Sequence, residues 1–119
     1  MAKGDDIQER LIAFAVMIIQ LCAELPKGVA NRHISGQLLR SGTAPAPNYA
    51  EARSAESDND FIHKLKITLK ELNETKTWLE ISERSGLLST TQISAIYSEC
   101  DELCRIISAS VKTMLSKRK

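Results

Sequence analysis

The stretch Gln37–Leu79 reads QLLRSGTAPAPNYAEARSAESDNDFIHKLKITLKELNETKTWL and decides the fold of the chain. Its first part has helical apolar spacing and then meets Gly42, Pro45 and Pro47. Proline lacks the amide donor that a helix interior needs, so this part predicts a second helix that is kinked or interrupted. The small residues around the prolines keep the helix thin, which favours close approach of a neighbouring helix.

The second part of the stretch predicts a regular amphipathic helix. Ser57 and Asp60 have the spacing of an N-terminal capping pair, and Gly86 is a natural C-terminal stop. One face carries apolar residues at helical spacing, namely Phe61, Leu65, Leu69, Leu72 and Leu79. This third helix therefore turns a single apolar face to a core.

A first helix is predicted from about Asp6, which forms a capping-like pair with Glu9, to Pro26. It carries two apolar stripes. One stripe consists of Ile7, Leu11, Phe14, Ile18, Leu21 and Leu25, and the other of Ile12, Val16, Ile19 and Ala23. An outer helix of a monomeric bundle needs only one such stripe, so the second predicts a further contact.

A fourth helix is predicted to open with Ser89 and Gln92 in capping-box spacing. Its apolar positions are Ile93, Ile96, Tyr97, Cys100, Leu103, Ile107, Val111 and Met114. Short connections make consecutive helices antiparallel. The sequence thus predicts an all-α, antiparallel up-down four-helix bundle with a proline-interrupted second helix, in one domain spanning residues 1–119.

Composition agrees with a single compact domain. The chain has 119 residues, of which 43% are hydrophobic, 26% charged and only 4% aromatic. A net charge of +1 gives no global electrostatic case for binding nucleic acid or an anionic membrane, so any basic surface must be local.

Two further features bear on location. The uncharged run Leu11–Ala23 is shorter than the roughly 20 residues that span a hydrocarbon core, so we expect no membrane insertion. Three cysteines without a disulfide framework, and the lack of a signal-like start, predict a reducing cytoplasm.

Cys100 and Cys104 stand four apart and share a helix face, as two metal ligands could. Both lie on an apolar stripe, however, and His33 and His63 are not paired at helical spacing. Free cysteine usually behaves as a small hydrophobe. We therefore expect core packing, with no metal and no cofactor.

Asp60 precedes His63 by three residues and could orient its imidazole for base chemistry. No glycine-framed serine nucleophile, phosphate-cradling loop or paired-histidine helix accompanies this pair. A solvated or structurally bonded histidine is the simpler interpretation. The sequence predicts that the protein is not an enzyme.

Charged residues of the second and third helices form a candidate polar cluster. Its members are Arg40, Asn48, Glu51, Lys64 and Glu71. Because partly buried charges need partners, fixing the kink is the favoured role, and a functional use is the alternative. Lys70 and Glu74 stand four apart and can also pair on a solvated face.

Five cations are candidate phosphate contacts of a nucleic acid: Arg32, Arg40, Arg53, Lys117 and Arg118. In one monomer they are widely spread. Repetition around a symmetric ring would multiply this modest basic surface, so the hypothesis depends on oligomerisation.

Three segments carry a family resemblance: QLLRSGT (37–43), NYAEA (48–52) and DFIHKLKITLKELNETKTWL (60–79). Over nearly its whole length, the chain resembles the four-helix-bundle proteins encoded in intervening sequences of bacterial 23S ribosomal RNA genes. The resemblance implies assembly into a homopentameric barrel, which would cover the second stripe of the first helix. It implies no known enzyme.

A related branch comprises accessory proteins of diversity-generating retroelements, which are basic pentamers that bind nucleic acid and a reverse transcriptase. The resemblance thus implies a homo-oligomeric scaffold that binds RNA, DNA or a nucleic-acid enzyme such as a reverse transcriptase. The near-neutral charge of this chain departs from that branch. A protein–protein adaptor without nucleic-acid binding is the alternative.

Overall fold

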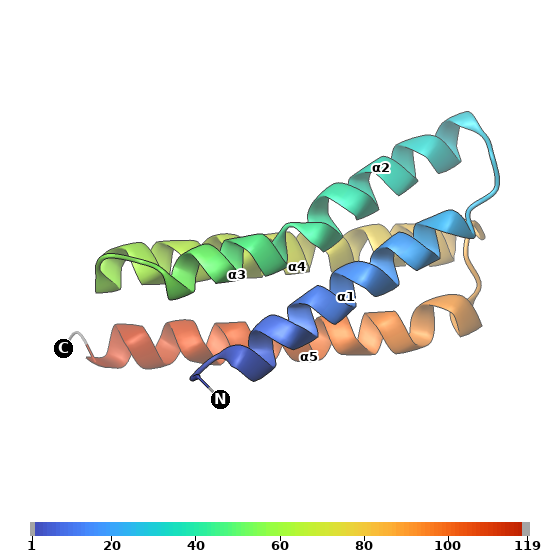
Figure 1. The fold of residues 1–119 in the computed structure, drawn as a ribbon. Helices are drawn as coiled ribbons and strands as arrows, with labels where there is room; N and C mark the ends of the chain where they lie inside the picture. The colour runs from blue at the N-terminus through green and yellow to red at the C-terminus, as the bar shows by residue number, and fades with distance from the viewer. Residues whose placement is uncertain (1, 118–119) are drawn as a thin grey trace.

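The computed structural model describes residues 2–117, and every regular element in that range is helical (Figure 1). The elements are α1 (Asp5–Ala23), α2 (Val29–Thr43), α3 (Pro45–Arg53), α4 (Asp58–Arg84) and α5 (Thr90–Lys117). Because α2 and α3 are the two halves of one bent helix, the elements make a four-helix bundle. The predicted fold class and the proline-interrupted second helix are confirmed.

The bend lies where α2 ends at Thr43 and α3 begins at Pro45. Ala44 between them keeps helical dihedral angles, with φ −71° and ψ −35°, so the chain continues in the same general direction. Pro45 and Pro47 lack amide donors, which removes two bonds from the helical ladder and lets α2 diverge from the line of α3 (Figure 1). Just beyond, the Asn48 side chain donates to the Ala44 carbonyl at 3.0 Å.

Small residues before the bend bring α2 close to two neighbours. Gly42 is buried, and a Cβ atom built there would lie 2.7 Å from Cγ1 and 2.9 Å from Cγ2 of Ile18 in α1. The adjacent Ser41 is fully buried, and its hydroxyl lies 2.9 Å from that of Thr75 in α4. The close helix approach predicted for this segment is thus present at Gly42.

The core face of α4 alternates leucines with hydroxyl residues. Its fully buried positions are Leu65, Thr68, Leu72, Thr75, Leu79 and Ser82. The three hydroxyls lie 2.8–2.9 Å from the carbonyls four residues earlier and can donate to them. These polar groups are therefore satisfied within their own helix, as buried hydroxyls require.

Helix starts agree with two of the three predicted caps. Ser57 Oγ accepts the Asp60 amide at 3.1 Å, and Ser89 and Gln92 form a reciprocal capping box with bonds of 2.8 and 3.1 Å. The predicted Asp6 cap is wrong. Helix α1 begins one residue earlier, and its N-cap is Gly4, whose φ of 92° suits glycine.

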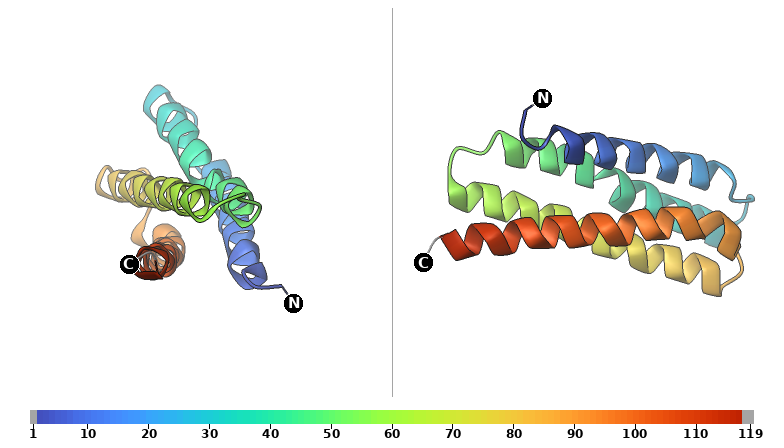
Figure 2. Two further views of the ribbon diagram at one scale, coloured as in Figure 1. Left: turned by 90° about the vertical axis from the view of Figure 1, so that its left-hand side faces the viewer. Right: turned by 90° about the horizontal axis from the view of Figure 1, so that it is seen from below.

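Helices that are consecutive in the sequence pack against one another. Helix α4 packs against α5 and against both halves of the bent helix, and α1 lies against α2, α3 and α5 (Figure 2). Arg10 of α1 bridges to α5 through Glu99 at 2.7 Å and Glu102 at 3.1 Å, and the bond to Glu99 raises the pKa of its guanidinium. No helix among residues 2–117 is long and apolar enough to cross a membrane.

Candidate functional site

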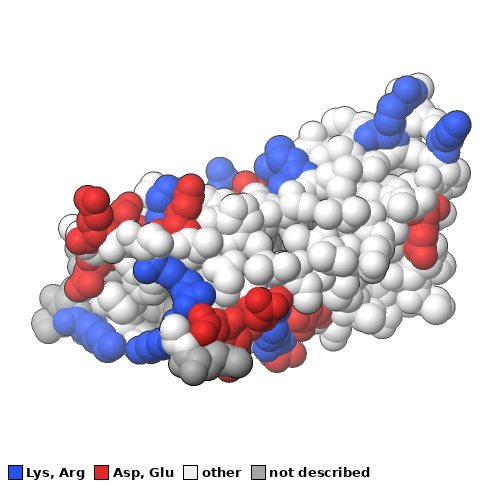
Figure 3. Space-filling model, in the orientation of Figure 1, with Lys and Arg blue, Asp and Glu red and all other residues white. Residues whose placement is uncertain are grey.

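The two apolar stripes of α1 have different environments. Leu11, Phe14 and Ile18 of the first stripe are fully buried in the core. In the second stripe Ile12, Val16 and Ile19 keep 43%, 46% and 51% of their surface exposed. Figure 3 shows a broad uncharged area across the middle of this view, in the region of α1 and α2. Every other helix of the described residues exposes at most one large apolar side chain.

The predicted phosphate-contacting cations do not converge. Arg40 is paired with Glu71 at 3.2 Å and also contacts Glu74, and Arg53 is paired with Asp5 at 2.6 Å. The hydrogen bond from Arg53 lowers the pKa of the Asp5 carboxyl. These two arginines therefore already have intramolecular partners in this chain.

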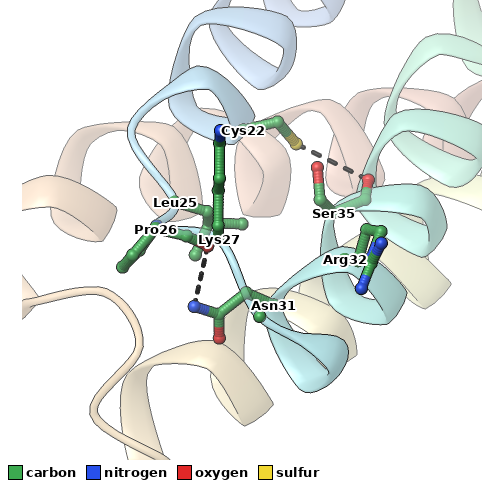
Figure 4. Close-up of a pocket in the computed structure, with 8 residues that line it drawn as sticks. Cys22, Leu25, Pro26, Lys27, Asn31, Arg32 and Ser35 are labelled. Carbon is green, nitrogen blue, oxygen red and sulfur yellow. Dashed lines mark hydrogen bonds between the residues drawn. The ribbon is translucent and has the colours of Figure 1, made fainter.

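Arg32 and Lys117 are exposed without an ion pair among residues 2–117, and Arg118 lies outside the described residues. Arg32 belongs to a pocket of about 560 Å³ at the turn between α1 and α2 (Figure 4). The pocket is lined by Cys22, Leu25, Pro26, Lys27, Gly28, Asn31, Arg32 and Ser35. The pocket places the cations of Lys27 and Arg32 near the N-terminal end of α2, and the N-terminal end of a helix favours anions.

The predicted polar cluster divides into separate pairs across the bent helix and α4. Arg40 meets Glu71, while Lys64 meets Glu51 at 3.2 Å. The Asn48 side chain donates a hydrogen bond to the Ala44 carbonyl at the bend. Lys70 and Glu74, whose spacing allows a pair, form none among the described residues, and Glu74 accepts instead from Arg40 and from the indole of Trp78.

The cysteines and histidines occupy separate positions. Cys100 donates to the Leu72 carbonyl at 3.2 Å and Cys104 to Asn73 Oδ1 at 3.5 Å, both from buried positions. His33 lies edge-on to Trp78 with 5.8 Å between ring centroids. Among residues 2–117 no group of three potential metal-ligating side chains is assembled.

A second hollow was not predicted from the sequence. It is a groove of about 420 Å³ between α4 and α5, here named the α4–α5 groove. It is lined by Leu69, Asn73, Lys76, Asp101, Cys104, Arg105, Ser108, Ala109 and Lys112. Its α4 residues Leu69, Asn73 and Lys76 stand at helical spacing, but this pattern does not differ from that of an ordinary solvated helix face.

These features define a class of protein, the antiparallel four-helix bundle with a bent second helix. The chain belongs to the family of 23S rRNA-intervening sequence proteins, whose family model matches residues 5–109. It is similar to a crystal structure from Bacteroides thetaiotaomicron of a protein with unknown function from the S23 ribosomal protein family. That similarity has a TM-score of 0.81 and 35% identity, covering 89% of this chain and 98% of the other. No curated protein matches the chain.

Proposed function

We propose that the protein is a non-enzymatic scaffold that self-associates through the exposed stripe of α1 and binds nucleic acid. The observation that carries the self-association is the half-exposed row Ile12, Val16 and Ile19 on a helix whose opposite face already fills the core. The subunit number of five rests on the family resemblance.

The apolar row can supply substantial association energy. Fully burying a valine or isoleucine side chain contributes about 1.5–3 kcal/mol, so the exposed halves of three such residues contribute roughly 3 kcal/mol per protomer. Since 1.4 kcal/mol corresponds to a tenfold change, this is more than about a hundredfold in an association constant. The stripe is therefore a reasonable core for an interface.

The self-association is tested by light scattering coupled to size-exclusion chromatography. We expect the wild-type mass to be near five times the 13.2 kDa of the chain. Val16→Glu should shift the mass to that of a single chain, because it places a charge in the centre of the stripe. Val29→Glu is the matched control, since Val29 is 81% exposed at the start of α2. A wild-type protein that elutes as a monomer refutes the proposal.

The nucleic-acid part of the proposal rests on exposed cations that assembly would repeat, with Arg32 and Lys117 as the predicted contacts whose charges have no partner among residues 2–117. Ultraviolet absorbance of the same chromatographic peak detects co-purifying nucleic acid. Loss of that absorbance at higher salt supports the proposal, because phosphate contacts weaken steeply with salt.

A protein–protein adaptor is the second candidate, and the intramolecular pairing of Arg40 and Arg53 favours it. An oligomer free of nucleic acid, with no affinity for added RNA or DNA, would support the adaptor. The resemblance to retroelement accessory proteins extends the scaffold proposal to a reverse transcriptase as its bound enzyme. Co-purification of tagged scaffold with such an enzyme tests that extension.

A further inference from the structure

The α4–α5 groove concentrates positive charge on an otherwise nearly neutral chain. Lys76, Arg105 and Lys112 line it, and Asp101 is the one carboxylate among the described residues lining it. Lys70 and Lys66 lie one and two turns before Asn73 on α4, beside the groove, and both are exposed. The three cations and one carboxylate that line the groove give it a net +2, and Lys66 and Lys70 add two positive charges beside it, whereas the whole chain carries +1.

Part of this charge has no partner within the protein. Asp101 pairs with Lys76 at 2.9 Å and with Arg105 at 3.0 Å, so a single carboxylate serves two cations. Lys66, Lys70 and Lys112 have no ion pair among residues 2–117. The nearby carboxylates Glu71 and Glu74 are engaged by Arg40. The groove and the adjoining face of α4 therefore offer three cations without an ion pair to an anionic partner, Lys112 in the groove and Lys66 and Lys70 beside it.

The shape and lining of the groove suit an extended anion. Along α4 the span from Lys66 to Lys76 is about 15 Å at 1.5 Å per residue, which is longer than a single phosphate group requires. Asn73 and Ser108 add neutral hydrogen-bonding groups between the charges. Neutral polar side chains and lysines commonly contact phosphate and sugar in nucleic-acid complexes.

We propose that the α4–α5 groove and the adjoining face of α4 bind the phosphodiester backbone of a nucleic-acid strand, with Lys112 in the groove and Lys66 and Lys70 beside it as direct phosphate contacts. This inference rests on the proposed nucleic-acid function but assigns it to a different surface from Arg32 and Lys117. It requires no base contacts, so the binding reads the backbone and not the sequence.

The test is fluorescence anisotropy of a labelled single-stranded RNA of about 20 nucleotides, titrated with the full chain at several salt concentrations. The groove variant combines Lys66→Gln, Lys70→Gln and Lys112→Gln. Its control combines Lys3→Gln and Arg84→Gln, which remove two charges from exposed positions outside both the groove and the pocket that contains Arg32. Glutamine and lysine have similar helix propensities, so circular dichroism should be unchanged.

Loss of three phosphate contacts should lower the slope of log affinity against log salt by about 2, since each contact to a single strand contributes about 0.7. Taking about 1 M salt as the point where this effect vanishes, the groove variant should bind roughly a hundredfold more weakly at about 0.1 M salt. The affinity of the control for the RNA should stay within about twofold of wild type, because its lost charges lie outside the groove and act only through the overall charge of the protein.

A third variant with Arg32→Gln and Lys117→Gln separates the two proposals. If this variant loses binding and the groove variant does not, the groove assignment is overturned and the nucleic-acid function stands. If the wild-type chain binds no oligonucleotide, both are overturned. A DNA strand of the same sequence is titrated in parallel, and the tighter binder identifies which nucleic acid supplies the phosphates.

Discussion

The close contact between Gly42 and Ile18 predicts opposite effects of the same substitution at two glycines of α2. In Gly42→Ala the new Cβ would lie 2.7 and 2.9 Å from the two γ carbons of Ile18, and 3.1 Å from its Cβ. These are atoms close to the backbone of a fully buried, β-branched residue, which has little rotamer freedom in a helix. The contact must therefore be relieved by shifting α1 relative to α2.

The magnitude follows from two opposing contributions. Overpacking a core costs about 1–3 kcal/mol, and this contact belongs in the upper half of that range because rigid atoms meet. Replacing a helical glycine by alanine returns about 1 kcal/mol. We therefore expect Gly42→Ala to lower the free energy of unfolding by about 1–2 kcal/mol. At about 4 °C per kcal/mol for a chain of this size, Tm should fall by about 4–8 °C.

Gly36→Ala is the matched control, because Gly36 lies in the same helix and a Cβ there meets nothing within 4 Å. It should raise Tm by about 4 °C from helix propensity alone. Both variants are compared with wild type by thermal circular dichroism at one protein concentration, since assembly makes Tm concentration-dependent.

A double-mutant cycle identifies the cause. Ile18→Ala removes both γ carbons, so Gly42→Ala should cost at least about 1 kcal/mol less in that background than in wild type. Ile18→Val keeps both γ carbons and should give no such relief. If Gly42→Ala stabilises the protein as Gly36→Ala does, or if its cost is the same in every background, then the contact with Ile18 is not the constraint.

Two further predictions concern ionisable groups along the α4–α5 groove. Lys76 donates a hydrogen bond to Asp101 and holds the pKa of that carboxyl below its ordinary 3.8. The ionised Asp101 therefore stabilises the fold above pH 3.8, and this stabilisation is lost as the pH falls through the lower folded-state pKa. Asp101→Asn should therefore be less stable at pH 7 and lose less stability on acidification, measured by urea unfolding across pH; an unchanged pH profile would contradict this. The neighbouring Cys100 thiol lowers the pKa of Cys104, which lines the groove, whereas Cys104 and burial raise the pKa of Cys100, and burial raises the pKa of Cys22. Iodoacetamide should therefore label Cys104 first, as read by peptide mass spectrometry, and prior labelling of either other cysteine would refute this order.

Much of the fold could be predicted because its signals are local. The prolines at 45 and 47 marked the bend, and the Ser57 and Ser89 caps marked two helix starts. The α1 start was misplaced because Gly4 caps the helix through its backbone conformation, which has no side-chain signature. Periodicity also distinguishes the two stripes of α1, which differ in exposure in the structure.

The charged surfaces were harder to predict because they depend on partners distant in sequence. Arg53 meets Asp5 across 48 residues, so its neutralisation has no local signal. The Arg40–Glu71 and Lys64–Glu51 pairs were anticipated within one cluster, but the separation of the pairs depends on the angle between helices. The α4–α5 groove was missed because its lysines have the ordinary pattern of a solvated helix face.

The bridge from Arg10 to Glu99 also has a consequence for the order of folding. Consecutive helices meet across short turns, where closing a loop of about five residues costs roughly 1.4 kcal/mol of chain entropy. The Arg10–Glu99 contact joins residues 89 apart, and closing that loop unaided costs about 4 kcal/mol by the same relation. The helical hairpins can therefore form early, while the contact between α1 and α5 forms late. On unfolding, opening this contact first releases the largest loop-closure entropy.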